Sequence, residues 1–147
     1  MPCLSRQLKD GLALITVMVG LSELRQQALR ASNQAVPPPQ KGEFIIDTGS
    51  DMSVVDPSAV MALGLHPRSM MKAHTLSTGG MAVEFGEYEV GLYLHGPQAG
   101  KGFHIPNLPV MGATFNAPSH QGLIGRDILA LGILIYSGAT QSYSLAF

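Results

Sequence analysis

The stretch Phe44-Ile45-Ile46-Asp47-Thr48-Gly49-Ser50-Asp51 constrains the fold more than any other, because an apolar run ends on a carboxylate. The apolar residues predict a buried strand with Asp47 at its end. Burying an isolated charge costs several kcal/mol or more, so this carboxylate must be hydrogen-bonded or paired. Thr48 and Ser50 place hydroxyls beside it, and Gly49 lets backbone amides approach it closely. The stretch is therefore predicted to hold Asp47 in a tight strand-to-turn junction.

A second stretch of the same character, Gly122–Leu129, contains an apolar pair, a glycine and the start of a short helix. Asp-Thr-Gly-Ser at 47–50 followed by Leu-Ile-Gly-Arg-Asp at 123–127 resembles the retropepsin-like aspartic proteases, the single-domain relatives of the retroviral enzymes. The resemblance covers roughly residues 12–21 and 42–147. By comparison, the helical and proline-rich residues 22–41 are an insertion.

The resemblance implies an all-β fold, a closed β-barrel with a flap hairpin and one or two short helices, assembled as a two-fold homodimer. It implies catalytic roles for Asp47, Thr48 and Gly49. Asp51 would bind the substrate backbone and pair with Arg126, which would act as a structural brace. The other positions predicted to bind substrate are Ser50, Thr78, Gly79, Gly80, Val83, Leu123 and Ile124.

The chemistry of peptide hydrolysis explains why a single Asp-Thr-Gly suggests two copies of the chain. Carboxylates alone can cleave a peptide when two of them share a proton, one acting as base and the other as acid. The simplest arrangement is that Asp47 of each copy meets across a two-fold axis, as the resemblance implies. The Ser50 hydroxyl should stabilise an ionised pair, which predicts a more acidic pH optimum. Asp127 is interpreted as a helix-start residue rather than a second catalytic acid.

The composition of the chain limits the classes of molecule that it is expected to bind. The chain has 147 residues, 46% of them hydrophobic and 13% charged, with a net charge of −1, which predicts one compact domain over residues 1–147. Without a Lys/Arg cluster we expect neither nucleic acid nor a membrane as partner, and a peptide or protein substrate fits better. Cys3 is the only cysteine and favours a cytoplasmic location. No metal or cofactor is expected, since the histidines lack ligand spacing: His66, His74, His95, His104 and His120.

The N-terminal run Leu12–Val19 follows Arg6 and Lys9 and superficially resembles a signal peptide. It is too short to span a bilayer, which needs about 20 apolar residues. Asp10 interrupts the basic region and no small-residue cleavage site follows. We therefore predict a β-strand, with a signal peptide as the alternative.

The insertion is predicted to begin with a helix over residues 21–33. Ser22 is the expected N-cap, and an apolar stripe is expected to face the protein: Leu21, Leu24, Ala28 and Ala31. The prolines at 37–39 end the helical pattern, so Asn33–Lys41 is predicted to be an extended linker. The insertion either covers a barrel edge or binds a partner.

The middle of the chain predicts a strand at Ser53–Val55 and then a helix that begins at Asp56-Pro57 and closes at Gly64. Ala73–Phe85 has two β-compatible arms around a Thr-Gly-Gly tip and predicts a hairpin. Its position matches the flap of the family that the chain resembles, and an ordinary surface hairpin is the alternative.

The last part of the chain predicts further strands and one helix. These are a strand at Tyr88–His95, a loop at Gly96–Gly102, an edge strand at His104–Thr114, a loop at Asn116–Gln121, a helix at Arg126–Leu131, and a hairpin around Gly138 formed by Ile133–Tyr136 and Ser142–Phe147. The final strand carries Tyr143, Leu145 and Phe147 on one side, an apolar edge predicted to need a partner. The resemblance implies that chain termini help to build the dimer sheet.

The sequence thus predicts an aspartic endopeptidase with apolar subsites, an Asp47 pair and an activated water. A catalytically inactive peptide-binding or dimerisation module on the same fold is the alternative. A further alternative is activity only within a larger assembly or after removal of the N-terminal segment.

Overall fold

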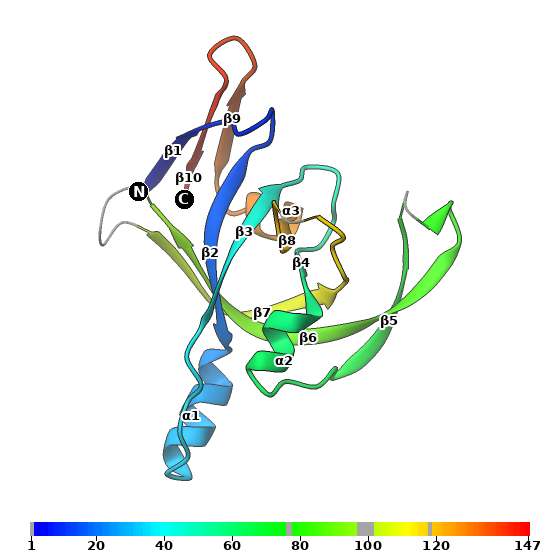
Figure 1. Ribbon diagram of the computed structural model, residues 1–147. Coiled ribbons are helices and arrows are strands. Elements are labelled where there is room, and N and C mark those ends of the chain that lie inside the picture. Colours follow the sequence, from blue (N-terminus) through cyan, green and yellow to red (C-terminus); the bar gives the residue numbers. More distant parts are fainter. Residues whose placement is uncertain (1, 76–77, 97–101, 118) are drawn as a thin grey trace.

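A six-stranded β-barrel forms the body of the molecule (Figure 1). The computed structural model describes residues 2–75, 78–96, 102–117 and 119–147. Neighbouring strands follow the order β2-β3-β8-β4-β7-β6, and β6 pairs back with β2 to close the barrel. The strands are β2 (Leu14–Leu21), β3 (Gln40–Ile46), β4 (Val54–Val55), β6 (Ala82–His95), β7 (Gly102–Gly112) and β8 (Gly122–Ile124). The predicted closed barrel is confirmed.

Side chains alternate between the inside and the outside of the barrel along each strand, and the inward ones fill it with aliphatic groups. In β2, Ile15, Val17 and Val19 point inward and are almost completely buried, whereas the residues between them are half-buried. This period of two is what a strand with one face in the core requires. The strand predicted for the apolar N-terminal run is confirmed as β2. In the residues that the structure describes, no helix is long and apolar enough to cross a membrane.

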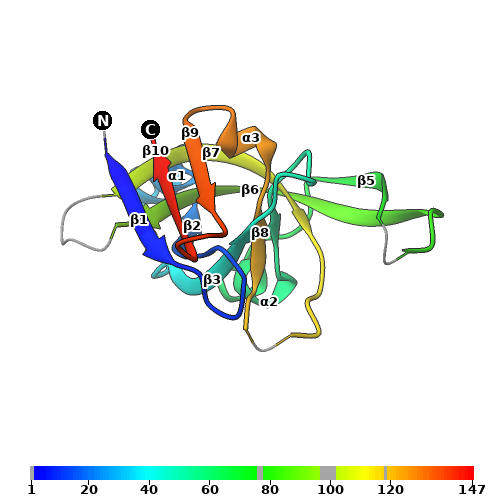
Figure 2. The ribbon, with the colours of Figure 1, turned by 90° about the horizontal axis from the view of Figure 1, so that it is seen from above.

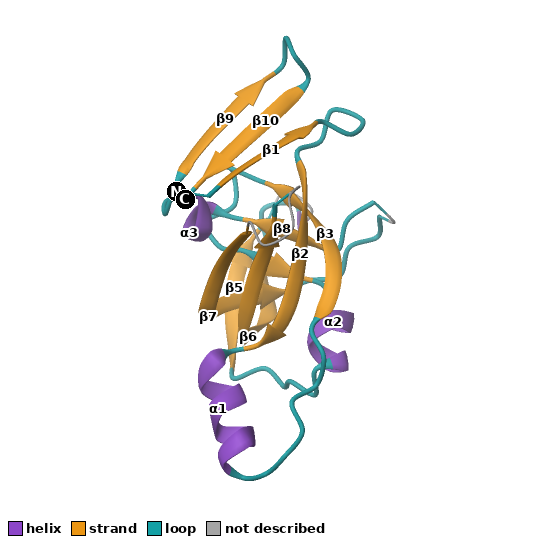
Figure 3. Ribbon diagram, turned by 90° about the vertical axis from the view of Figure 1, so that its left-hand side faces the viewer, coloured by secondary structure: helices purple, strands orange, loops and turns teal. Residues whose placement is uncertain are grey.

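The two ends of the chain form a separate three-stranded sheet in the order β1-β10-β9, with β1 at Cys3–Gln7, β9 at Ile133–Ser137 and β10 at Ser142–Ala146 (Figure 3). Tyr143 and Leu145 of β10 are buried, and Phe147 stacks on Phe103 with ring centroids 4.0 Å apart. The terminal hairpin is confirmed. The partner predicted for the apolar side of β10 lies within the chain itself, because the chain's own core covers that side and β10 lies between β1 and β9.

A long β-hairpin projects from the barrel where β5 (Ser69–His74) pairs with the first half of β6 (Figure 2). We predicted a break in β6 between Phe85 and Tyr88, and the structure shows one continuous strand of 14 residues. Gly86 lies at the supposed break. A Cβ there would come within 3.1 Å of both Pro67 and Tyr88, so the glycine relieves crowding rather than ending a strand.

Strand β7 is not the simple edge strand that its prolines predicted. It lies between β6 and β4, although its pairing with β4 is limited to Met111 and Gly112. Its register with β6 shifts between Val90 and Leu92, where two residues of β7, Pro106 and Asn107, lie opposite one residue of β6, so one extra residue is accommodated by an irregularity in the ladder. The predicted loops beside it lie partly outside the described residues, at 97–101 and at 118.

Among the described residues there are three short helices: α1 (Glu23–Ala31), α2 (Pro57–Ala62) and α3 (Arg126–Leu129). The predicted caps are confirmed, because Ser22 accepts from the Arg25 amide at 3.3 Å and Asp56 from the Ser58 amide at 2.9 Å. The predicted inward stripe of α1 is wrong, since Leu24 is exposed and Leu29 packs against the core instead. Helix α3 ends two residues earlier than predicted.

Candidate active site

Strand β3 delivers Asp47 to the surface beside β8. The two strands run parallel, with Ile46 opposite Ile124, and the Asp47 amide donates to the Ile124 carbonyl at 3.0 Å. After Ile46 the chain turns sharply, because the Gly49 amide donates to Asp47 Oδ1 at 2.8 Å. The predicted strand-to-turn junction is present. The carboxylate therefore has one oxygen held by the backbone of its own turn.

Arg126, the first residue of α3, ties the second motif to this turn. Its amide donates to the Ser50 carbonyl at 2.9 Å, and its Nη1 donates to the Thr48 carbonyl at 2.8 Å. Its Nη2 forms an ion pair with Asp51 Oδ1. One arginine thus contacts three of the residues that follow Asp47: Thr48, Ser50 and Asp51. The pairing of Asp51 with Arg126 that the resemblance implied is found.

Ser53 and Asp127 form a second tie that sequence reasoning missed. Asp127 Oδ2 accepts from the Ser53 amide at 2.8 Å and Oδ1 accepts from the Ser53 hydroxyl at 2.7 Å. The Ser53 hydroxyl accepts in turn from the Gly125 amide at 3.0 Å, and Ser53 is completely buried. Asp127 Oδ1 also accepts from the Ile128 amide at 2.9 Å. Asp127 therefore supports the start of α3, as expected, and also holds the strand after the turn.

Two glycines let these backbones approach. A Cβ on Gly125 would lie 2.6 Å from the Met52 carbonyl carbon, so only glycine fits between the two motifs. A Cβ on Gly122 would lie 2.3 Å from the Phe44 ring. The two motifs therefore lie in close contact at these two points, Gly125 against Met52 and Gly122 against Phe44.

The comparisons with known proteins agree with this geometry. A family model described as aspartyl protease matches residues 33–128, more than half of the chain. The chain belongs to the aspartyl protease family. Among solved structures, a retropepsin-like aspartic protease from Rickettsia conorii matches with a TM-score of 0.60 and 15% identity, over 99% of this chain and 90% of that one. That likeness shows a retropepsin-like fold. The comparison with curated proteins gave no match.

In this member of the aspartyl protease family, the turn that follows Asp47 is open to solvent. Thr48 and Gly49 are exposed, and the Asp51 side chain is 86% exposed although it is paired. A cavity of about 280 Å³ lies next to the turn, lined by Thr48, Ile46, the loop 11–13, and Leu134 and Tyr136 of β9. The turn thus presents one carboxylate with a hollow beside it.

The position of the Ser50 hydroxyl differs from the expectation. It donates to the Met52 carbonyl at 2.6 Å and therefore stabilises the turn. The contact with the Asp47 carboxylate, on which the prediction of a more acidic optimum depended, is not formed. The acidic optimum thus loses its physical basis in this structure.

The subsite residues predicted on β8 and β6 lie in different environments. Ile124 is completely buried in the core, so its side chain does not reach the surface and its carbonyl is the group that supports Asp47. Leu123 is half-buried. Val83 is exposed on the projecting hairpin, as are Met70 and Met81 near it. The hairpin therefore carries apolar side chains that the isolated chain leaves in water.

The tip of the hairpin is shaped by Thr78 and two glycines. The Thr78 hydroxyl contacts the Thr75 and Met81 carbonyls, each at 2.8 Å, and Gly79 and Gly80 adopt positive φ angles of 63° and 81°. The predicted Thr-Gly-Gly turn is thus present. Residues 76 and 77 of the predicted hairpin lie outside the described residues.

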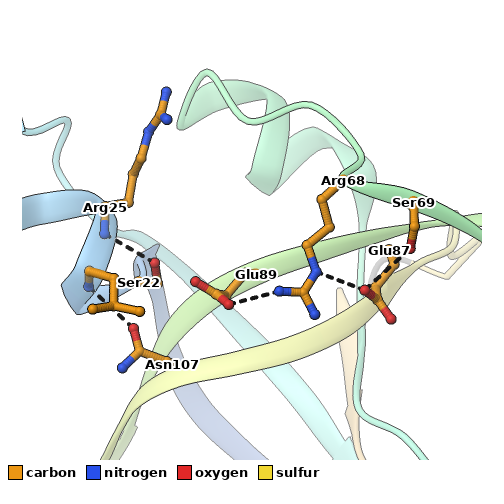
Figure 4. Close-up of polar contacts among 8 residues, drawn as sticks. Ser22, Arg25, Arg68, Ser69, Glu87, Glu89 and Asn107 are labelled. Atoms are coloured by element: carbon orange, nitrogen blue, oxygen red, sulfur yellow. Dashed lines mark hydrogen bonds and ion pairs between the residues drawn. The ribbon is translucent and has the colours of Figure 1, made fainter. Parts of the chain in front are cut away.

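The base of the hairpin is held by a charged clamp of Arg68, Glu87 and Glu89 (Figure 4). Arg68 Nε lies 2.7 Å from Glu87 Oε1, and its Nη1 lies 2.8 Å from Glu89 Oε2. The hydrogen bond to Glu87 and the charges of both glutamates raise the pKa of Arg68. Because Glu87 and Glu89 also pair with β7, the clamp fastens the start of β5 to the part of β6 that belongs to the barrel.

The part of the chain that the structure describes contains no group of three or more His, Cys, Asp or Glu side chains arranged to hold a metal ion. The groups gathered near Asp47 are hydroxyls, backbone amides, one arginine and two further carboxylates. They can position a carboxylate and form hydrogen bonds to a peptide backbone.

Proposed function

We propose that the chain is an aspartic endopeptidase that hydrolyses peptide bonds with Asp47 from two copies. The observation that supports this most directly is the Asp47 turn itself, in which the half-buried Asp47 carboxylate is held by the Gly49 amide and the following residues are braced by Arg126. An aspartate without a functional role does not need so many hydrogen bonds and ion pairs around its turn. Membership of the aspartyl protease family supports the same reading.

The proposed reaction needs one ionised and one protonated Asp47. The ionised carboxylate takes a proton from a water molecule as the water oxygen bonds to the scissile carbonyl carbon. The protonated carboxyl of the other copy gives its proton to the carbonyl oxygen, which produces a neutral tetrahedral intermediate. Collapse of the intermediate breaks the C–N bond while a proton passes to the leaving nitrogen. Two carboxyls held close together share one proton because both cannot be ionised at such short range.

The substrate would lie between the turn and the hairpin. Thr48, Gly49 and the exposed Asp51 offer groups that can hydrogen-bond an extended peptide backbone, and the tip Thr78–Gly80 offers backbone amides from the opposite side. Exposed apolar residues on the hairpin, including Val83, suit apolar substrate side chains. These assignments extend the proposal from the chemistry to the binding of substrate.

Cleavage of a mixed peptide library at several pH values, with wild type and Asp47→Asn side by side, tests the proposal. We expect wild type to cut and Asp47→Asn to lose roughly 10³-fold or more in rate, since a proton-transferring carboxylate is removed. Glu23→Gln, which removes a negative charge from the exposed first turn of α1, is the control and should cut normally. A statine-type transition-state analogue should inhibit wild type. If wild type binds peptides but cuts none where it is dimeric, the chain is a binding module.

A further inference from the structure

The outer face of the barrel carries a cavity at the place where the insertion 22–41 meets β2 and β6. Its volume is about 350 Å³, compared with about 280 Å³ for the cavity beside Thr48. Binding sites for small molecules begin at roughly 300 Å³ and are mostly apolar. None of the described residues that line this cavity is Asp, Glu, Lys or Arg. The lining therefore suits an uncharged ligand, because a charged one would lose water without gaining a partner.

Two glycines that face each other form the floor of the cavity. Gly20 of β2 lies directly opposite Gly91 of β6, so the backbone of both strands is bare there. The fold needs Gly91, because a Cβ would lie 2.8 Å from the Leu21 carbonyl oxygen. A Cβ on Gly20 would meet only Pro39, at an ordinary 3.6 Å, so packing does not require this glycine. Glycine inside a strand is typical of a place where another group approaches the backbone closely.

Large side chains on three neighbouring strands form one wall. Met18 lies opposite Tyr93 and Tyr93 lies opposite His104, so the three form a row across β2, β6 and β7. The row is two residues from the glycines along β2 and β6, which places it on the same face of the sheet. The ring centroids of Tyr93 and His104 are 6.4 Å apart. A thioether and two rings make favourable contacts with another flat ring.

The insertion 22–41 supplies a second wall. Gln26 on α1 and Pro39 in the linker both line the cavity. The Gln26 side chain is held at both of its polar atoms, since Nε2 donates to the Leu21 carbonyl at 2.9 Å and Oε1 accepts from Arg30 at 3.0 Å. The helix and the linker thus enclose the space above the glycines without filling it.

We propose that this cavity binds a small uncharged molecule that carries a flat aromatic ring. The ring would lie on the backbone of Gly20 and Gly91 and against the row that contains Tyr93. His104 is exposed, and its imidazole can hydrogen-bond one polar atom at the edge of the ligand. A phenol or an indole has this shape and polarity. The insertion then has a role in the molecule, because it forms part of a binding site.

The site is separate from the Asp47 turn. Strand β2 leads from the loop 11–13 to α1 (Figure 1), and the Ala13 carbonyl accepts from the Ile46 amide next to the turn. Seven residues separate Ala13 from Gly20, and an extended chain of that length spans about 23 Å. The inference therefore goes beyond the proposed function and holds whether or not the chain cleaves peptides.

Titration with indole, followed in amide NMR spectra of the protein, tests the site. We expect saturable binding to wild type with a dissociation constant of about 1 mM or lower. Gly20→Val should bind indole roughly tenfold more weakly or worse, because its methyl groups occupy the floor of the cavity. Gly138→Val is the matched control. A Cβ at Gly138 would meet nothing closer than the Tyr136 ring at 4.0 Å, so this variant should bind like wild type.

The positions of the shifted amides decide where indole binds. Shifts are expected at residues 18–21 and 91–93 and at Gln26 and His104, and not in the Asp47 turn. This mapping uses wild type alone, so it remains decisive if Gly20→Val folds poorly. The inference is overturned if binding does not saturate by about 10 mM indole, or if the shifts centre on the hairpin or the Asp47 turn. Equal weakening by Gly20→Val and Gly138→Val would overturn it too.

Discussion

The Asp47 turn and the β5–β6 hairpin are the two parts of the proposed site, and they are held in opposite ways. The turn is tied to the second motif by Arg126 and Asp127 and by backbone contacts too close for any side chain at Gly125. The hairpin is held by its own ladder and, at its base, by the Arg68 clamp. One part is fixed from many directions and the other from one end.

The difference matches the two tasks that the proposed reaction sets. A carboxylate that must share a proton with its copy needs a position fixed to a fraction of an ångström, which a densely braced turn supplies. A cover that admits and releases a peptide must open, and a ribbon anchored at one end can do so at low cost. Substitutions should therefore cost stability in the turn and should change motion or substrate binding in the hairpin.

The largest effect is expected from Gly125→Ala. The added methyl would meet backbone atoms of Met52 and Ser53 between 2.6 and 2.9 Å away, and these atoms can move only if the two motifs separate. We expect a loss of about 3 kcal/mol in the free energy of unfolding by urea denaturation. Gly79→Ala at the hairpin tip, where only the positive φ opposes a side chain, should lose about 1 kcal/mol. Equal losses at the two glycines would remove the contrast between the regions.

A smaller loss is expected from Asp127→Asn. The amide keeps one acceptor oxygen and turns an NH₂ group toward donors of Ser53 or Ile128, so at least one buried hydrogen bond is lost. We expect about 2 kcal/mol less stability, measured by urea denaturation, together with reduced peptide cleavage. Glu23→Gln removes a negative charge from the exposed first turn of α1 and should leave both stability and cleavage unchanged. A fully stable and fully active Asp127→Asn would show that this tie is not needed.

The carboxylate of Asp56, the residue after β4, should contribute to the pH dependence of the free energy of unfolding. Burial raises its pKa, but the hydrogen bonds from Ser58 and Phe115 outweigh burial and hold the pKa below the ordinary 3.8. A pKa that is lower in the folded state stabilises the fold above about pH 4, and this stabilisation is lost as the pH falls through the folded value. Asp56→Asn should therefore flatten the acid limb of the stability curve. If Asp56→Asn leaves the acid limb unchanged, the loss of stability at low pH comes from other groups.

The smallest effect on stability is expected from Arg68→Gln at the hairpin base. The clamp is open to solvent, so we expect an unchanged melting temperature but faster amide hydrogen exchange in β5, residues 69–74, and a raised KM at constant kcat. High salt should produce the same change in wild type by screening the clamp. Arg25→Gln, an exposed arginine outside the clamp, is the control. Unchanged exchange in β5 would show that the ladder alone holds the hairpin.

The turn could be predicted from sequence because its determinants are local. An apolar strand, an acid and a glycine within eight residues dictate a strand-to-turn junction, and the resemblance supplied the partner Arg126. The bond between Ser53 and Asp127 could not be read in this way, because its ends are 74 residues apart. The usable signal was Ser53, a serine directly before the apolar pair Val54-Val55, because a buried hydroxyl needs a hydrogen-bond partner.

The wrong predictions from sequence concern what covers the apolar face of a strand or helix, rather than which residues form that face. Alternation in the last strand correctly grouped Tyr143 with Leu145, but alternation cannot tell whether a second copy or the chain's own core buries that face. The apolar stripe of α1 was equally ambiguous, because alanines gain little from burial and Leu29 makes the contact instead. Ile124 was predicted to bind substrate for the same reason. Its side chain points into the core, and only its carbonyl contacts the Asp47 turn.

Mixing wild type with Asp47→Asn tests most directly whether two copies share one active site. The total protein concentration is kept constant and high enough for dimers to exchange freely, and peptide cleavage is measured as the fraction of wild type is varied. If each active site needs Asp47 from both copies, activity should fall as the square of the wild-type fraction, because every mixed dimer is inactive. Activity that falls in direct proportion to the wild-type fraction would show that one copy cuts alone, and the account of a shared pair would be wrong.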